Sequence, residues 1–138
     1  MKIIFPLVLV FALFSCNTPK EIFVDNPHTL RFGSAGGFTN QTIVFKLLSD
    51  GKLWKSDGLE KEPILLKQLK KSQTKKIFNQ AYQLGLDTLN LNSPGNMNNF
   101  IQLKTKTLDN KIVWAKDSKQ ASPEVIDFYK TLINYSKP

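Results

Sequence analysis

The chain contains very few of the side chains on which most enzyme chemistry depends. Its 138 residues include one histidine, His28, and one cysteine, Cys16. A single cysteine excludes an internal disulfide, and a zinc site would need several His or Cys ligands. A Ser–His–Asp site would depend wholly on His28, and the sequence has no Gly-x-Ser-x-Gly elbow and no Asp-rich calcium loop. The sequence therefore predicts no metal site, no cofactor and no catalytic residue.

The remaining candidates for chemistry are weak. His28 follows Pro27 at the start of a predicted strand, which favours an ordinary surface position. Glu60 and Glu62 form a carboxylate pair of the kind that glycosidases use, but a solvated loop is the favoured interpretation because acids are rarely buried. A hydrolase is therefore the weakest of the functional alternatives.

Arginine is also scarce. Of the 19 basic residues only Arg31 is an arginine, although the formal net charge is +8. Sites that read phosphate or nucleic acid favour the planar arginine fork, so this composition argues against a nucleic-acid partner. A lysine-rich surface suits anionic lipid, an acidic glycan or an acidic protein, or simply keeps the domain soluble.

The N-terminus has the layout of an export signal. Lys2 precedes an unbroken apolar run over residues 3–14, which contains Pro6. This run is shorter than the roughly 20 residues that span a bilayer. A short basic start followed by such a run predicts a secretory signal peptide in preference to a buried strand or helix.

The end of this run resembles the lipobox of bacterial lipoproteins. The residues are Leu13-Phe14-Ser15-Cys16, with Leu three residues before Cys and a small residue directly before it; Phe14 departs from the usual smaller residue. The resemblance implies that Cys16 receives a lipid, with palmitate among the acyl chains, and becomes the N-terminus. Localisation would then be the bacterial cell envelope, on the periplasmic or the surface side.

The expected organisation follows from this processing. Residues 1–15 are the signal peptide, residues 16–21 are the lipidated cysteine and a polar tether, and residues 22–138 form a single globular domain. The membrane is then a partner through the lipid anchor.

The first expected hairpin is centred on Asp50-Gly51, a pair typical of two-residue turns. It joins strands at 42–48 and 52–56 and sets Leu47 opposite Trp54. In this register one face is predicted to enter the core. Its members are Ile43, Phe45, Leu47 and Trp54.

A second hairpin is expected around Asp109-Asn110, between strands at 100–107 and 111–116. One face of this hairpin is again apolar. Its members are Ile101, Leu103, Ile112 and Trp114. Each hairpin would thus give one tryptophan to a common interior.

Two amphipathic helices complete the pattern. The first is expected to begin at Ser72 as N-cap and to stop at Gly85, and the second to begin at Ser122-Pro123-Glu124. Further strands are expected at 22–24, 30–33 and 63–69, and a loop at 90–99. The fold class is therefore α+β, an antiparallel sheet of hairpins with two helices on one face, in the order ββ(β)-α-ββ-α.

The most distinctive local feature is the glycine-rich stretch Gly33-Ser34-Ala35-Gly36-Gly37-Phe38. It resembles a Gly-Gly-Phe-Thr segment in small uncharacterised bacterial envelope lipoproteins, a family that implies no activity. One interpretation is a loop or bulge that needs positive φ. The other is a candidate binding loop, formed by Gly33, Gly36, Gly37 and Phe38, that lets a partner approach closely.

The densest charge cluster is a candidate basic patch. It consists of Lys67, Lys70, Lys71, Lys75 and Lys76. Docking on an anionic membrane is one interpretation, at about 1 kcal/mol per lysine, and a solvated face is the favoured one.

Three functions are compatible with these features. The first is a lipid-anchored binding or accessory protein of the envelope, which holds an envelope protein, or less readily a glycan, through the loops around 33–37 and 90–99. The second is an envelope inhibitor or immunity-type protein that blocks one enzyme. The hydrolase is third.

Overall fold

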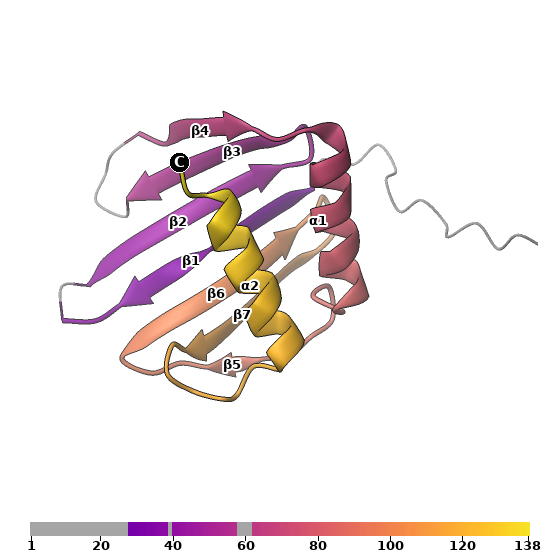
Figure 1. Cartoon of the computed structure of the whole chain (residues 1–138). Coiled ribbons are helices and arrows are strands. Elements are labelled where there is room, and N and C mark those ends of the chain that lie inside the picture. Colours follow the sequence, from indigo (N-terminus) through magenta and orange to yellow (C-terminus); the bar gives the residue numbers. More distant parts are fainter. Residues whose placement is uncertain (1–27, 39, 58–61) are drawn as a thin grey trace, which may run out of the picture.

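The computed structural model describes residues 28–38, 40–57 and 62–138 (Figure 1). The signal segment, Cys16, Glu60 and the strand expected at 22–24 lie outside these residues. The strands are β1 (Thr29–Gly36), β2 (Gln41–Leu48), β3 (Lys52–Asp57), β4 (Ile64–Gln68), β5 (Asn92–Ser93), β6 (Met97–Lys104) and β7 (Asp109–Ala115). The helices are α1 (Lys71–Gln83) and α2 (Pro123–Tyr135).

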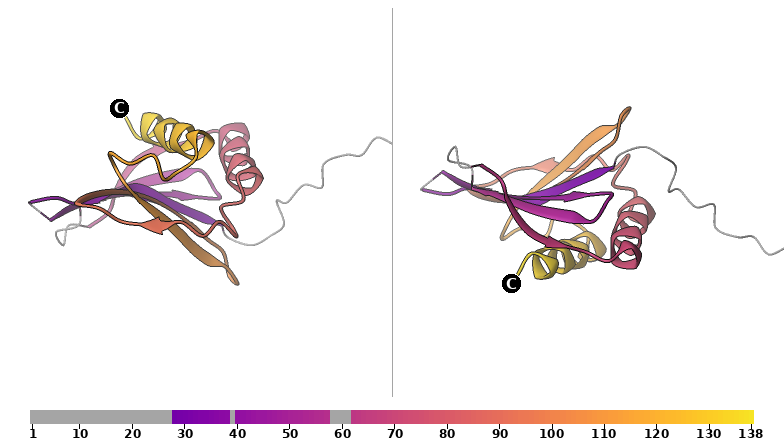
Figure 2. Two further views of the ribbon diagram at one scale, coloured as in Figure 1. Left: turned by 90° about the horizontal axis from the view of Figure 1, so that it is seen from below. Right: turned by 90° about the horizontal axis from the view of Figure 1, so that it is seen from above.

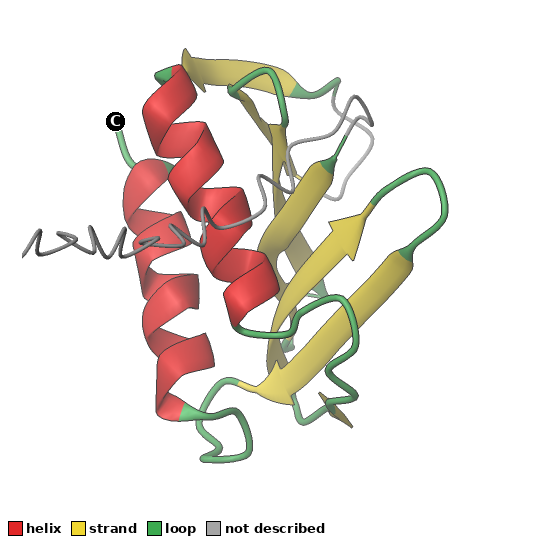
Figure 3. Cartoon of the chain, turned by 90° about the vertical axis from the view of Figure 1, so that its right-hand side faces the viewer, coloured by secondary structure: helices red, strands yellow, loops and turns green. Residues whose placement is uncertain are grey.

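The described chain forms two layers. One sheet of seven strands, in the order β4-β3-β2-β1-β6-β7-β5, is the first layer. Both helices pack on the same face of this sheet (Figures 2 and 3). Neighbouring strands are antiparallel except for the short β5, which pairs parallel with β7. The α+β class and the placement of both helices on one face are therefore confirmed, and the element order is ββββ-α-βββ-α.

The core lies between the helices and the face of the sheet that they cover. The sheet contributes Leu30, Phe32, Leu47, Leu53, Ile101, Leu103, Ile112 and Trp114. The helices contribute Ile77, Phe78, Ala81, Val125, Phe128 and Leu132. Burial of each large apolar side chain contributes about 1.5–3 kcal/mol, which holds the helices on the sheet without a disulfide.

The first hairpin has a different register from the predicted one. Its loop has three residues, Ser49–Gly51, because Gly51 adopts φ 91° and its N–H donates to the Leu48 carbonyl at 2.9 Å. This is a turn followed by a left-handed glycine, the usual form of a three-residue hairpin loop. Leu47 therefore pairs with Leu53, and Lys46 pairs with Trp54. Since one step of register moves a side chain to the opposite face, the prediction that Trp54 enters the core is wrong.

The second hairpin has the predicted faces but another turn. Lys104 pairs with Asp109, so Asp109 and Asn110 lie in β7 and the loop is 105–108. Thr105 closes this loop, because its Oγ1 accepts from the Leu108 N–H at 3.1 Å. Asn110 instead ties β7 to the segment after α1, donating from Nδ2 to the carbonyls of Leu86 and Leu89, both at 2.9 Å. All four residues predicted to face the core are buried.

The helix ends are partly as predicted. The N-cap of α1 is Lys70, two residues before the predicted cap, since the Lys70 N–H donates to Oε1 of Gln73 at 3.1 Å and Ser72 lies inside the helix. The helix stops before Gly85 as expected, and Gly85 has φ 68°. Helix α2 has the predicted start, because Oγ of Ser122 accepts from the Val125 N–H at 3.3 Å.

The predicted loop at 90–99 is largely incorporated into the sheet. Strand β5 lies within it, and β6 already begins at Met97. The residues between the two strands are 94–96, and only these form the turn. Asparagine and proline content suggested a loop, but pairing with β1 and β7 overrides that local tendency.

Candidate functional site

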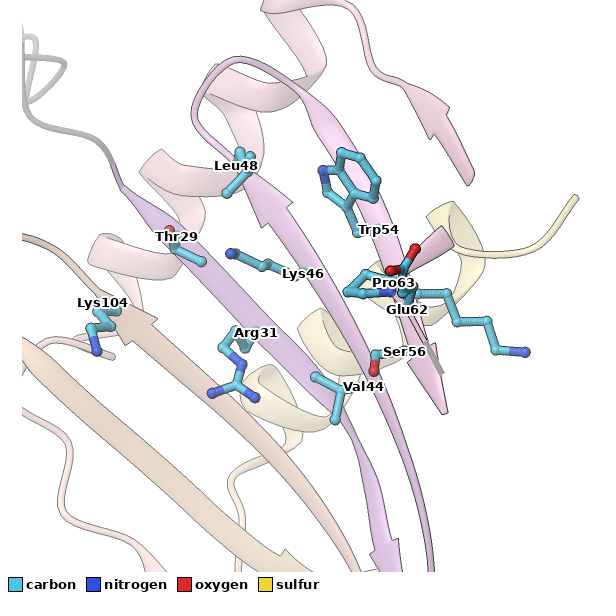
Figure 4. Close-up of a pocket in the computed structure, with 11 residues that line it drawn as sticks. Thr29, Arg31, Val44, Lys46, Leu48, Trp54, Ser56, Glu62, Pro63 and Lys104 are labelled. Carbon is cyan, nitrogen blue, oxygen red and sulfur yellow. The ribbon is translucent and has the colours of Figure 1, made fainter. Parts of the chain in front are cut away.

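The face of the sheet opposite the helices, called here the open face, carries a hollow of about 890 Å³ (Figure 4). Its lining comes from strands β1, β2, β3 and β6 and from residues 62 and 63, which precede β4. The lining includes Arg31, Lys46, Lys104, Trp54, Val44 and Leu48. Ligand sites in proteins commonly measure about 300–1,000 Å³, so the hollow is large enough for a small molecule.

A row of directly paired residues crosses the floor of this hollow. Trp54 pairs with Lys46, Lys46 with Arg31, and Arg31 with Gln102. Directly opposite side chains on one face have Cβ atoms about 4.5–5.5 Å apart, and like charges in such a pair are destabilising. The sheet therefore holds two cations side by side at its centre, at a cost in stability.

Hydrogen bonds orient one of these cations. Nη1 of Arg31 donates to Oε1 of Gln102 at 3.2 Å, and Gln102 in turn donates from Nε2 to Oδ1 of Asp109 at 2.5 Å. Lys104 forms an ion pair with the other oxygen of Asp109 at 3.3 Å. These donors, Gln102 first and then Lys104, hold the pKa of Asp109 below its ordinary value.

Two cations of the hollow keep their charge available. Among the described residues, the ion pairs involve Lys52, Lys55, Lys104 and Lys130, and leave Arg31 and Lys46 outside ion-pair distance of a carboxylate, although the charge of Arg31 also helps to lower the pKa of Asp109. Arg31 uses one of its five N–H donors on Gln102, so the rest of the fork can serve a ligand. The arrangement thus offers two positive charges and several N–H donors that an anion could meet.

The rest of the hollow is mixed in character. The half-buried indole of Trp54 forms part of its apolar wall together with Val44 and Leu48. Hydroxyl groups come from Thr29 and Ser56, and a carboxylate comes from Glu62 (Figure 4). A bound molecule would therefore meet an aromatic surface and hydrogen-bonding groups beside the two cations.

The two loops predicted to form a binding rim do lie together, at one end of the sheet. The Gly37 N–H donates to the Asn96 carbonyl at 2.8 Å, and Gly36 pairs with Met97. Phe38, at the tip of the turn between β1 and β2, is fully exposed. The structure thus joins residues 36–38 to the turn at 94–96 and presents one aromatic side chain there.

The glycines of this stretch have structural tasks. Gly36 has φ 103°, and a Cβ on it would lie 2.5 Å from the Asn96 carbonyl oxygen. Gly37 has φ 84°, and a Cβ on it would overlap Sδ of Met97. A side chain at either position would disturb this packing, so Phe38 is the better probe of binding.

Gly33 lies within β1 and not in a loop. Its carbonyl accepts from the hydroxyl of Tyr129 on α2 at 3.0 Å, which links the sheet to the helix layer. Burial raises the pKa of Tyr129 to about 12. Phe100 lies directly opposite Gly33 on β6, and Nζ of Lys111 lies 4.7 Å from the centre of its ring.

The basic patch is split between two elements. Lys67 belongs to β4, and its Nζ donates to the Lys137 carbonyl at 2.5 Å, near the C-terminal end of the chain. Lys70 precedes α1, and Lys71, Lys75 and Lys76 lie in its first two turns. Lys70, Lys71 and Lys76 are exposed, and Lys67 and Lys75 are half-buried, so the patch covers the surface at the start of α1 and part of β4.

His28 is not the surface residue that was predicted. It is buried at the start of β1, with edge-on ring contacts to Phe78 at 5.9 Å and to Tyr82 at 5.8 Å. The described residues contain no group of three or more His, Cys, Asp or Glu side chains arranged to hold a metal. Glu62 lines the hollow, and its predicted companion Glu60 lies outside the described residues.

Comparison with known proteins adds no assignment. No family model matches the chain, and no curated protein is significantly similar to it. Within the part of the chain that the structure describes, neither helix is long and apolar enough to cross a membrane.

Sequence reasoning missed the central site. It counted Arg31 only as a sign of arginine scarcity and assigned Trp54 to the core. The signal that could have found the site is the alternation of Val44, Lys46 and Leu48, which marks a half-polar strand face, combined with a three-residue loop.

Proposed function

We propose that this chain is a lipid-anchored binding protein of the bacterial envelope, with the hollow on the open face as its binding site. The observation that carries the proposal is the pair Arg31 and Lys46, two cations that lie directly opposite each other in a ligand-sized hollow and form no ion pair with another described residue. A domain that only needed stability would gain from an acid or a neutral residue at one of these positions. A binding site explains why both charges stand there.

The anchor is consistent with this role. Cys16 precedes His28, the first described residue, by twelve positions, a length of chain that reaches at most about 40 Å. A segment of this length would keep the domain within about one domain diameter of the membrane surface. The open face would then meet ligands that are themselves part of the envelope.

The lipid anchor has a direct test. We expect labelled palmitate to enter the wild-type protein in the source bacterium and to be absent from Cys16→Ala, because the thiol is the acceptor of the lipid. Phe14→Ala serves as the matched control, since it places a small residue in the lipobox and should be labelled at least as well. Equal labelling of the wild type and Cys16→Ala would contradict the anchor.

A second candidate function is inhibition of one envelope enzyme. The observation that favours it is Phe38, a fully exposed aromatic ring at the tip of a turn that is braced by the bond between Gly37 and Asn96. Inhibitors commonly insert one rigid aromatic side chain into a pocket of the target, where it becomes a hot spot.

The inhibitor alternative predicts that Phe38→Ala abolishes capture of a partner. Truncating a hot-spot aromatic costs about 2 kcal/mol or more, roughly a thirtyfold loss of affinity. Tagged full-length protein in detergent would be used as bait in envelope extract, with Lys119→Gln, an exposed change elsewhere, as the control. A partner retained equally by wild type and Phe38→Ala would rule out the tip as the contact.

A further inference from the structure

The geometry of the hollow points to a specific ligand class: we propose that it binds an acidic saccharide. A carboxylate of the sugar would lie between Arg31 and Lys46, and a sugar ring would lie against Trp54. This inference rests on the proposed function in one respect, that the open face is the binding surface. It adds the chemistry of the ligand.

The charges of Arg31 and Lys46 favour an anionic ligand. Arg31 and Lys46 form a direct cross-strand pair, so their charged groups can reach a single anion between them. Gln102 fixes the guanidinium from one side at 3.2 Å and thereby directs the remaining donors of Arg31. Bonds from ionised donors to a carboxylate are short and strong, and an arginine fork can make two of them in parallel.

The indole of Trp54 provides an apolar surface beside the two cations. Trp54 pairs directly with Lys46 on the same face, so a ring attached to the anion would reach the indole. Aromatic side chains present a broad apolar surface, on which the C–H face of a sugar ring can pack. The same lining also offers hydrogen-bond partners for the hydroxyl groups of a sugar. These partners are the hydroxyls of Thr29 and Ser56 and the carboxylate of Glu62.

The shape of the site favours a saccharide over a membrane surface as the ligand. The anion site lies on the floor of a hollow of about 890 Å³ and not on a projecting surface. Anionic headgroups attract lysines that stand on a surface near the membrane plane, whereas these two cations belong to the lining of the hollow. A single molecule or a short chain end can enter the hollow, where it meets both cations and the tryptophan.

The test is calorimetric titration of the full-length protein in detergent. The probes are a short oligogalacturonate, a neutral galactan oligomer of the same length, inorganic phosphate, and phosphatidylglycerol carried in micelles of the same detergent. We expect binding of the acidic oligomer, no comparable binding of the neutral one, and weakening by added salt because the contact is ionic. Arg31→Gln and Lys46→Gln should each weaken binding by about tenfold or more, since loss of one charge-assisted bond is of that size. Trp54→Ala should also weaken binding, because the apolar surface for the sugar ring is lost.

Two controls separate a lost site from a lost fold. Lys119→Gln removes one exposed positive charge outside the hollow and should leave the affinity unchanged. Lys46→Gln should also melt at the same temperature as the ligand-free wild type or higher, because it removes one member of a like-charged pair. A variant that binds weakly while its melting temperature is preserved has lost the site alone.

Three results would contradict the saccharide proposal. Equal affinity for the acidic and the neutral oligomer, or binding that survives Lys46→Gln and Arg31→Gln, would overturn the saccharide proposal. Binding of phosphate or of phosphatidylglycerol micelles through these residues, with no binding of the oligomer, would overturn the ligand class and leave the open face as a binding surface. Absence of binding by every probe would overturn the ligand class, and with it the evidence for the open face.

Discussion

Gly33→Ala is expected to destabilise the domain by about 3 kcal/mol, the combined cost of a strained backbone and of overpacking. Gly33 has φ 156°, a conformation that residues with a side chain rarely adopt. A Cβ at this position would also overlap the carbonyl oxygen of Ile43 in β2, and neither backbone can move without breaking the pairing of β1 with β2. The bond from Tyr129 to the Gly33 carbonyl would be disturbed at the same time.

Urea unfolding followed by circular dichroism measures this effect, and Gly85→Ala is the matched control. Gly85 also has a positive φ, 68°, but the nearest atom to its Cβ would be Oγ1 of Thr88 at 3.9 Å. It should therefore lose only about 1 kcal/mol, the cost of the conformation alone. Equal effects at the two glycines would show that the contact with Ile43 is relieved by small shifts and that packing at β1 is not the constraint.

The comparison of Gly33→Ala with Gly85→Ala bears on the role of the glycine-rich stretch. The sequence left open whether its glycines meet a backbone requirement or line a binding rim. Gly33, Gly36 and Gly37 all have positive φ, and a side chain on each would collide with β2, Asn96 or Met97 respectively. The backbone requirement accounts for them, and among the four residues of the predicted loop only Phe38 is left as a candidate contact.

The elements that sequence predicted well are those whose signals are local. Helix α2 has a serine cap, proline at its first position and Glu124 in its first turn, where hydrogen bonds from the helix start and Ser122 lower the pKa of that carboxyl. Gly85 ends α1 because the left-handed conformation after a helix favours glycine. Such signals act within one turn of the chain, so they can be read without knowing what packs against it.

The register of the first hairpin could not be predicted in the same way. Asp50-Gly51 suits a two-residue turn, yet it also suits a three-residue loop that ends in a left-handed glycine. The choice depends on long-range contacts: the Gly51 carbonyl accepts at 2.9 Å from the N–H of Leu69, which directly follows β4. The one-residue difference moved Trp54 from the expected core to the open face and thereby created one wall of the hollow.

The candidate site was hidden for the same reason. Arg31, Lys46 and Trp54 are spread over 24 positions of the chain and have no spacing that marks a motif. Only the order of strands β3, β2 and β1 brings them into one row. A site of this kind is a property of sheet pairing, so it appears with the fold and not before it.

The largest loss of stability is expected from Phe128→Ala, at about 3–5 kcal/mol, which is a large part of the total stability of a domain of this size. Phe128 lies in the middle of α2 and is completely buried, between the helix layer and the sheet. Truncation would remove its apolar contacts and leave a cavity, since the sheet and α1 hold the surrounding backbone in place. The variant should unfold at much lower urea concentration and at lower temperature.

Phe38→Ala provides the control, because the chemical change is identical and Phe38 is fully exposed. Its free energy of unfolding should match that of the wild type within about 0.5 kcal/mol, as is usual for surface positions. A large loss for both variants would mean that Phe38 is covered in solution, by a segment of this chain or by a second copy. A small loss for both would mean that α2 contributes little to the stability of the sheet. It would contradict the conclusion that apolar burial holds the helices on the sheet.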